Sequence, residues 1–332
     1  MALPEHDLTF RAMGCKLRVL VGPALDGSGS TSSEVMANEV RRTIDNFDQK
    51  MTRFSAESEL SHLNADPRET VPASPLLRAL VSAGIWAAEE SNGLLDPTLN
   101  DSLERVGYGT TMGNATPASL PDALLDSPAP RPAAPRRDSL WRSIIVDDEA
   151  GTITRPSGVK LDSGGVGKGL IADACASMLA GRERFCVNAS GDLRIGGPDA
   201  LRDPYRVTIE DPFGGENLAT VRVGHGAVAT SGIGTRLWKT QWGFAHHLLD
   251  PSTGEPAWTG IVQATAMAPT ALEAETRAKQ VLLGGRRAAS LLELDGGLIL
   301  LDDGTVEVFG PVAEAMQNRH LRLVPDSESE AA

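Results

Sequence analysis

The sequence has few cysteines and no long apolar run. Its 332 residues include three cysteines, Cys15, Cys175 and Cys186, whose spacing matches no common metal site. An odd number of thiols without such a spacing predicts free cysteines in a reducing compartment. No apolar stretch reaches the roughly 20 residues of a membrane-spanning helix. We therefore expect a protein that does not insert into a membrane.

Positive charge is scarce, and the N-terminus has no apolar core. The chain carries 31 lysines and arginines against 44 aspartates and glutamates, a net charge of −13. This balance disfavours nucleic acid as a partner, although it is compatible with a local basic pocket. The first residues, MALPEHDLTFRAMGC, place charged side chains where a signal peptide needs apolar ones. These features predict a cytoplasmic protein.

The patterns that are present predict an α+β fold. Apolar residues recur at spacings of three and four over residues 32–54 and again in SPLLRALVSAGIWAAEESNG, which predicts two amphipathic helices. Thr270 and Glu273 form a capping-box pattern that opens a further helix. The stretches SIIVDDEAGTITRP and GLILLDDGTVEVFG predict hairpins. Strands cluster, with helices between the clusters, and this order favours α+β over a regular βαβ alternation.

Composition divides the chain into four parts. We expect an N-terminal lobe at residues 1–110 and a proline-rich, exposed connection at 111–140. A second lobe follows at 141–322, and an acidic tail at 323–332 is predicted to be disordered.

The stretch VKLDSGGVGKGLIADACASML, residues 159–179, is rich in glycine ahead of a helical pattern. Glycines allow a ligand to approach closely, and the free N–H groups of a helix N-terminus favour an anion. It is no Walker A motif, because Gly169 follows Gly167-Lys168 where that motif has Ser or Thr. It is no dinucleotide fingerprint either, because Leu170 replaces the third glycine. By itself the stretch is either a phosphate loop or a tight turn that packs a helix on a sheet.

Seven stretches taken in order resemble a known family. They are MGCKLRV, DQKMTRFSAESELSHLN, GLLDPTLN, LDSGGVGKGLIADA, VNASGDLRIGG, ATSG with HHLLDPSTGEP, and TALEAETRAK with LLGG. The set resembles the ApbE-type family, the FAD:protein FMN transferases, from about Met13 to Gly284. The resemblance implies a two-lobed α+β fold with mixed or antiparallel sheets, flanking helices and a flavin cleft between the lobes.

The resemblance also implies residues that contact FAD. Two of them, Asp162 and Lys168, lie in the glycine-rich stretch, where Lys168 offers a charge to the phosphates. The other implied contacts are Met13, Phe54, Leu95, Asp96, Pro97 and Leu249. Core packing remains an alternative for Met13 and Phe54.

Two further assignments have structural alternatives. Asp96 and Pro97 match the family's FAD-lining segment but also the pattern of an ordinary turn. His247 matches the family's histidine, and it is either a catalytic base or a structural histidine on a strand.

The implied metal site departs from the family pattern. The family binds Mg²⁺ through a backbone carbonyl, here that of Gly165, and through Asp and Thr four residues apart on the last helix. This chain has Glu275 and Lys279 at those two positions. An ammonium group cannot ligate a cation, so Mg²⁺ is a doubtful cofactor. The pair either replaces the cation or forms an ordinary surface ion pair.

The function implied by the resemblance is transfer of FMN from FAD to a threonine or serine hydroxyl of an acceptor protein, with release of AMP. FAD and that acceptor are the expected partners. Because the metal positions differ, two alternatives stay open: an FAD-binding protein without catalysis, and a pyrophosphatase that converts FAD to FMN and AMP.

Overall fold

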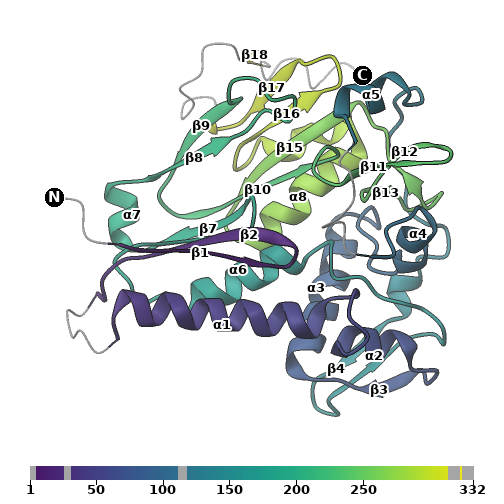
Figure 1. Ribbon diagram of the computed structural model, residues 1–332, viewed down its shortest axis with the longest axis horizontal. Coiled ribbons are helices and arrows are strands. Elements are labelled where there is room, and N and C mark those ends of the chain that lie inside the picture. The colour runs from purple at the N-terminus through teal and green to yellow at the C-terminus, as the bar shows by residue number, and fades with distance from the viewer. Residues whose placement is uncertain (1–4, 26–30, 111–117, 313–321, 324–332) are drawn as a thin grey trace.

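A large mixed sheet forms the centre of the structure, a computed structural model that describes residues 5–25, 31–110, 118–312 and 322–323. Nine strands lie in the order β1-β2-β6-β7-β10-β15-β16-β17-β18 (Figure 1). Their bounds are β1 His6–Ala12, β2 Cys15–Val21, β6 Phe185–Asn188, β7 Asp192–Gly196, β10 Gly226–Gly232, β15 Ile261–Ala268, β16 Gly297–Leu301, β17 Val306–Phe309 and β18 Arg322–Leu323. Neighbours pair antiparallel except β17 and β18, which pair parallel.

Three helices form a layer on the sheet. Helix α1 (Ser33–Met51) packs against β1 and β2, α8 (Ala271–Gly284) packs against β10 and β15, and α6 (Gly167–Met178) lies between them (Figure 1). Helix α1 buries the apolar face expected from its spacing, including Val40, Ile44 and Phe47. The capping box at Thr270 is present, with reciprocal bonds between Thr270 and Glu273. These helices begin where the sequence predicts.

The remaining elements surround this core. The small sheets contain β3 Thr70–Pro72, β4 Ile145–Asp147 and β5 Thr152–Thr154; β8 Tyr205–Ile209 and β9 Ala219–Val223; β11 Leu237–Thr240 and β12 Gly243–His246; and β13 Leu249–Asp250 and β14 Glu255–Pro256. The other helices are α2 Glu59–Ala65, α3 Pro75–Glu90, α4 Asn100–Arg105, α5 Leu120–Leu125 and α7 Pro198–Arg202, with 3₁₀ turns at η2 Leu140–Ser143 and η3 Arg286–Leu292. Figure 1 shows α2, α3, β3 and β4 grouped beside one end of α1.

Residues 1–110, the predicted N-terminal lobe, contribute elements that pack with the second half of the chain. Strand β2 pairs with β6, and α1 contacts α6, so these N-terminal elements share the central sheet and its helical layer with the second half of the chain. Helix α3 contacts β4, which pairs with β5, as well as α1 and α6, and α2 contacts α1. These contacts arise because strands from distant parts of the chain, such as β2 and β6, pair with each other. Such pairing cannot be predicted from composition.

The proline-rich connection is partly packed. Residues 111–117 lie outside the described part, but α5 follows and buries Leu120 and Ala123. The backbone N–H groups of Arg131 and Ala133 donate to the carbonyls of Trp258 and Leu283. Most side chains of 118–140 are nevertheless exposed. The predicted acidic tail lies outside the described residues apart from Leu323, the last residue of β18.

The cysteines are free thiols, as predicted from their number. Burial raises the pKa of Cys175 and of Cys186 to about 12, so both stay protonated. Among the described residues, no helix combines the length and the apolar character needed to cross a membrane.

Candidate functional site

A cleft of about 940 Å³ opens where the helical layer meets the loops around α2, α3 and α4. Its lining includes eleven of the twelve residues proposed from the sequence: Met13, Phe54, Leu95, Asp96, Pro97, Asp162, Gly165, Lys168, His247, Leu249 and Lys279. The twelfth, Glu275, is fully buried and bonds to Lys279 behind the lining. Segments far apart in the chain thus meet at one cleft.

One wall of the cleft, which we call the charged wall, consists of Lys168, Asp192, Glu275 and Lys279. Lys168 Nζ lies 2.6 Å from Asp192 Oδ2 on β7, and Lys279 Nζ lies 2.6 Å from Glu275 Oε1, one turn earlier on α8. The second oxygen of Glu275 accepts from the N–H of Gly169 at 2.7 Å. Two lysines therefore reach the cleft with a buried carboxylate behind each.

The surroundings of Lys168 and Glu275 raise the pKa of both side chains. Burial by itself lowers the pKa of Lys168, but the charges of Asp192 and Glu275 outweigh burial and raise it. Burial raises the pKa of Glu275, and the nearby Lys279 opposes that rise. Buried charges need such partners, because an isolated ion in the interior is strongly unfavourable.

Glycine at position 169 makes the charged wall possible. A Cβ at this position would lie 2.6 Å from the carbonyl oxygen of Ala271 and 2.7 Å from Leu272 Cα. The first turns of α6 and α8 therefore touch through their backbones. This contact brings Lys168 and Glu275 within electrostatic reach of each other.

A second cluster, which we call the aromatic wall, consists of Arg53, Phe54, Tyr108 and Arg236 in the cleft lining, with Trp238 packed against Tyr108 outside the lining. The Arg53 guanidinium lies 4.3 Å from the centroid of Phe54 and 4.5 Å from that of Tyr108. Tyr108 stacks on Trp238 with centroids 5.6 Å apart. Arg236 lies 5.8 Å from the Tyr108 ring. Cation–π contacts of this kind hold an arginine beside a ring at modest energy.

The glycine-rich loop contacts this second wall through Asp162. One carboxylate oxygen lies 2.9 Å from Arg53 Nε, and the other accepts from the Gly164 N–H at 2.8 Å. Both oxygens are thus already engaged within the chain, although each has a second lone pair. Arg53 Nη2 is buried and has no hydrogen-bond partner among the described residues.

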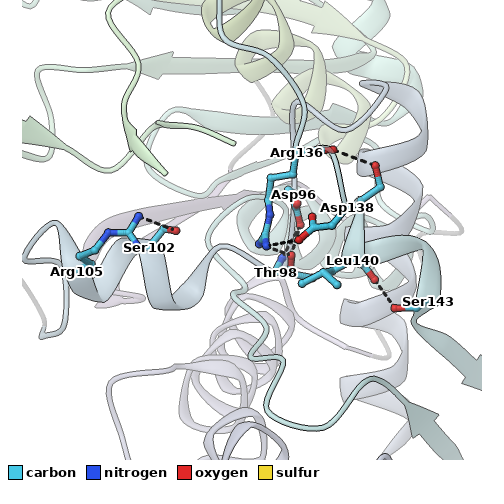
Figure 2. A network of polar contacts seen from close by, with 9 residues as sticks. Asp96, Thr98, Ser102, Arg105, Arg136, Asp138, Leu140 and Ser143 are labelled. Atoms are coloured by element: carbon cyan, nitrogen blue, oxygen red, sulfur yellow. Dashed lines mark hydrogen bonds and ion pairs between the residues drawn. The ribbon is translucent and has the colours of Figure 1, made fainter. Parts of the chain in front are cut away.

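Asp96 lies in the cleft lining and belongs to a network of polar contacts, which Figure 2 shows. Its Oδ1 accepts from the Thr98 N–H at 2.8 Å and from the Thr98 hydroxyl at 2.6 Å, and Arg136 donates to that hydroxyl. Its Oδ2 is buried and has no partner among the residues described. Burial raises the pKa of Asp96. The turn expected from Asp96-Pro97 is therefore present, and one oxygen is left for a ligand donor.

Met13 and His247 lie at two other points of the cleft lining. Met13 and Gly14 both have positive φ, 52° and 68°, at the tip of the β1–β2 hairpin, and the Met13 N–H donates to Asp48 on α1 at 2.6 Å. His247 is half-buried, and its Nδ1 has no partner among the described residues. Burial, followed by the charge of Arg236, holds the pKa of His247 well below its usual range. Its imidazole is neutral at pH 7 and can accept a proton.

Comparison with known proteins assigns the family. The model of the ApbE family matches residues 13–300. The chain belongs to the ApbE family. Relatives named FAD:protein FMN transferase include one from Klebsiella pneumoniae (strain 342), 26% identical over 300 residues, which spans 88% of this chain and 82% of the relative. Another, from Treponema pallidum (strain Nichols), is 27% identical over 331 residues and spans 93% and 88%.

Solved structures of the family share the fold. The ApbE protein from Thermotoga maritima superposes with a TM-score of 0.77 at 25% identity, over 95% of this chain and 100% of that one. The flavinyl transferase ApbE from Pseudomonas stutzeri has a TM-score of 0.73 at 20% identity and covers 95% and 98%. The predicted ApbE-like α+β architecture, with antiparallel sheets and flanking helices, is confirmed.

The residues at the family's metal positions do not fit a divalent cation. Both oxygens of Glu275 are hydrogen-bonded, one to Lys279 and the other to the Gly169 N–H, and its side chain is fully buried outside the cleft lining. A ligand for Mg²⁺ must offer free oxygen, which an ammonium lacks. Among the described residues, no group of three or more His, Cys, Asp or Glu side chains is arranged to hold a metal ion. That the Gly165 carbonyl is a metal ligand stays a prediction.

Sequence reasoning missed several residues of the two walls. Asp192 follows a predicted strand in VNASGDLRIGG, and Arg53 directly precedes Phe54, so both lie inside quoted motifs. Tyr108 is one of only two tyrosines in the chain, which could have marked it. Arg236 and Trp238 carry no comparable signal, because only the fold brings Arg236 to the cleft and Trp238 against Tyr108.

Proposed function

We propose that this protein is a flavin transferase that moves FMN from FAD to a threonine or serine hydroxyl of an acceptor protein and releases AMP. The observation that carries the proposal is the cleft itself, which is lined by both fixed cations and aromatic side chains, in a chain of the ApbE family. FAD has a pyrophosphate, which the lysines of the charged wall can bind, and a flavin ring, which the aromatic wall can contact. The cleft volume is within the range of small-molecule sites.

The two walls divide the work of binding. Lys168 and Lys279 offer charge-assisted hydrogen bonds to the phosphate oxygens. Phe54 and Tyr108 offer ring faces and edges to the flavin. The unpartnered Asp96 Oδ2 offers an acceptor to a ring N–H or a ribose hydroxyl.

The reaction is a displacement at phosphorus. The acceptor hydroxyl oxygen bonds to the phosphorus of the FMN half, the phosphoanhydride bond to AMP breaks, and the bonding electrons leave with the AMP phosphate. His247, neutral because of its lowered pKa, accepts the hydroxyl proton and passes it to solvent. The lysines offset the charge that develops on the phosphate oxygens. Positioning supplies much of the acceleration, because the protein forms no covalent bond itself.

The test measures three products. The protein is incubated with FAD and a mixture of threonine- and serine-containing peptides, and AMP, FMN and peptide masses are followed by chromatography and mass spectrometry. We expect AMP to appear together with peptides that have gained FMN with loss of water. AMP with free FMN instead identifies a pyrophosphatase, and intact bound FAD identifies a binding protein. A His247→Gln variant should bind FAD normally but release AMP about 10²–10⁴-fold more slowly.

A further inference from the structure

The charged wall contains a buried ion pair, Glu275–Lys279, whose lysine lines the cleft. Lys279 is 6% exposed, lies in the cleft lining, and pairs with a glutamate that is 0% exposed. The alternative interpretation from the sequence, an ordinary surface ion pair, is therefore wrong, because both side chains are buried. A buried lysine that lines a ligand cleft places its ammonium where an anion can reach it.

We propose that the Lys279 ammonium, held by Glu275, serves as a built-in cation that binds the phosphates of FAD in place of a divalent metal. The proposal rests on the proposed function, because it takes FAD as the ligand. Binding of the dinucleotide then needs no metal ion.

The hydrogen-bond geometry supports this role. Lys279 has three N–H donors, and Glu275 Oε1 takes one at 2.6 Å. No other acceptor among the described residues bonds to Lys279 Nζ, so two donors are available to phosphate oxygens at the cleft. Glu275 cannot rotate away freely, because the Gly169 N–H holds its other oxygen.

The surrounding charges support the same reading. Lys168 and Asp192 form a second pair, and Lys168 and Lys279 both line the cleft, each near enough to His247 for its charge to add to burial in lowering the pKa of that imidazole. Each lysine is neutralised by a carboxylate behind it. A dianionic pyrophosphate can bridge two such ammonium groups without a metal, because each supplies a fixed positive charge.

The first experiment uses the unmodified protein. FAD affinity is measured by quenching of flavin fluorescence, once with Mg²⁺ and once with EDTA. We expect the two dissociation constants to agree within about threefold, because the cation belongs to the chain. A larger loss of affinity in EDTA overturns the proposal, since it shows that a metal is required.

The second experiment separates a ligand role from a structural one. Replacing Lys279 alone leaves Glu275 buried and unpaired, which can unfold the protein. The double variant Lys279→Met, Glu275→Gln removes both charges, keeps similar volumes and keeps an acceptor for the Gly169 N–H. We expect its affinity for FAD to fall about tenfold to a hundredfold, the range for loss of a charge-assisted hydrogen bond.

Riboflavin, which has no phosphate, is the comparison ligand. We expect its affinity for the double variant to stay within about threefold of the unmodified protein, because Lys279 does not contact the ring. Unchanged FAD affinity, or equal losses for both ligands, overturns the proposal, because Lys279 would then only neutralise Glu275. Lys239→Met is the matched control, since Lys239 is exposed and outside the cleft lining.

The outcomes distinguish this inference from the proposed function. A protein that binds no FAD in either buffer contradicts the proposed function. A protein that binds FAD only with Mg²⁺ contradicts the built-in cation and leaves the proposed function standing.

Discussion

The charged wall and the aromatic wall of the cleft are built in opposite ways. The charged wall stands on regular elements, α6, α8 and β7, and each lysine is fixed by a buried carboxylate. The aromatic wall stands mainly on loops and on the β11–β12 hairpin, and its rings hold one another through stacking and cation–π contacts.

The difference has a physical reason. A buried charge tolerates little displacement, because loss of its partner leaves an ion without solvent. Because α6 and α8 touch through their backbones at Gly169, the side chains that they carry are held in fixed positions. Ring contacts are weaker and less directional, so loops suffice to hold them. We expect changes in the charged wall to alter phosphate recognition strongly, and changes in the aromatic wall to alter flavin recognition mildly.

The largest expected effect concerns Lys168. Lys168→Met, combined with Asp192→Asn to avoid an unpaired buried carboxylate, should weaken FAD about tenfold to a hundredfold and riboflavin little, because one charge-assisted hydrogen bond to phosphate is lost. Fluorescence titration with both ligands measures this. Lys160→Met is the control, since Lys160 pairs with Asp101 and Glu104 outside the cleft lining. Equal losses for FAD and riboflavin would show that Lys168 does not read phosphate.

The second prediction tests how closely α6 and α8 must approach. Gly169→Ala should lower the free energy of unfolding by about 1–3 kcal/mol, because its methyl group would collide with the backbone of Ala271 and Leu272. Urea denaturation measures the change. Gly181→Ala is the matched control, because a Cβ there meets nothing within 4 Å and should not destabilise. Equal stability of the two variants would contradict the close contact.

The third prediction concerns the hairpin behind the aromatic wall. His246 on β12 is fully buried beside Trp258, and burial lowers its pKa from 6.5 to about 3. Between pH 6.5 and pH 3, His246 is therefore protonated in the unfolded chain but neutral in the folded chain. The resulting stability is fully present above pH 6.5 and is lost as the pH falls towards 3.

Between pH 7 and pH 5 this group should reduce the free energy of unfolding by about 2 kcal/mol. The reduction should largely disappear in His246→Asn, whatever the stability of that variant at pH 7. Urea denaturation at the two pH values measures it, with the exposed His225→Asn as control. An identical pH dependence in His246→Asn and the unmodified protein would rule out His246 as its source.

The smallest expected effect concerns Tyr108. Tyr108→Leu removes the ring stack on Trp238 and the cation–π contact between Arg53 and Tyr108. Each interaction is worth at most about 0.5–1.5 kcal/mol. FAD and riboflavin should weaken by similar, severalfold factors, since both carry the flavin ring. Trp242→Leu, an exposed residue outside the cleft lining, is the control. A loss of affinity for FAD but not for riboflavin would mean that the aromatic wall recognises phosphate. The proposed difference between the two walls would then be contradicted.

Local patterns in the sequence determined the elements that later position the site. The spacing of apolar residues predicts α1 and α3, the capping box predicts α8, and the final hairpin is present as β16 and β17. These elements follow from neighbours three or four residues apart, or from short turns, which a single sequence displays directly. The ordered motifs also identified residues that meet at one cleft.

Only the tertiary structure decided how those residues are partnered. It placed Glu275 and Lys279 in the interior, paired Lys168 with Asp192, and turned Asp162 towards Arg53. It also brought Tyr108 and Trp238 together across more than a hundred residues of chain. The spacing of Glu275 and Lys279 predicts that they share a helix face, but not which layer covers it. That depends on the contact between α6 and α8 at Gly169, and so on how the distant strands pair.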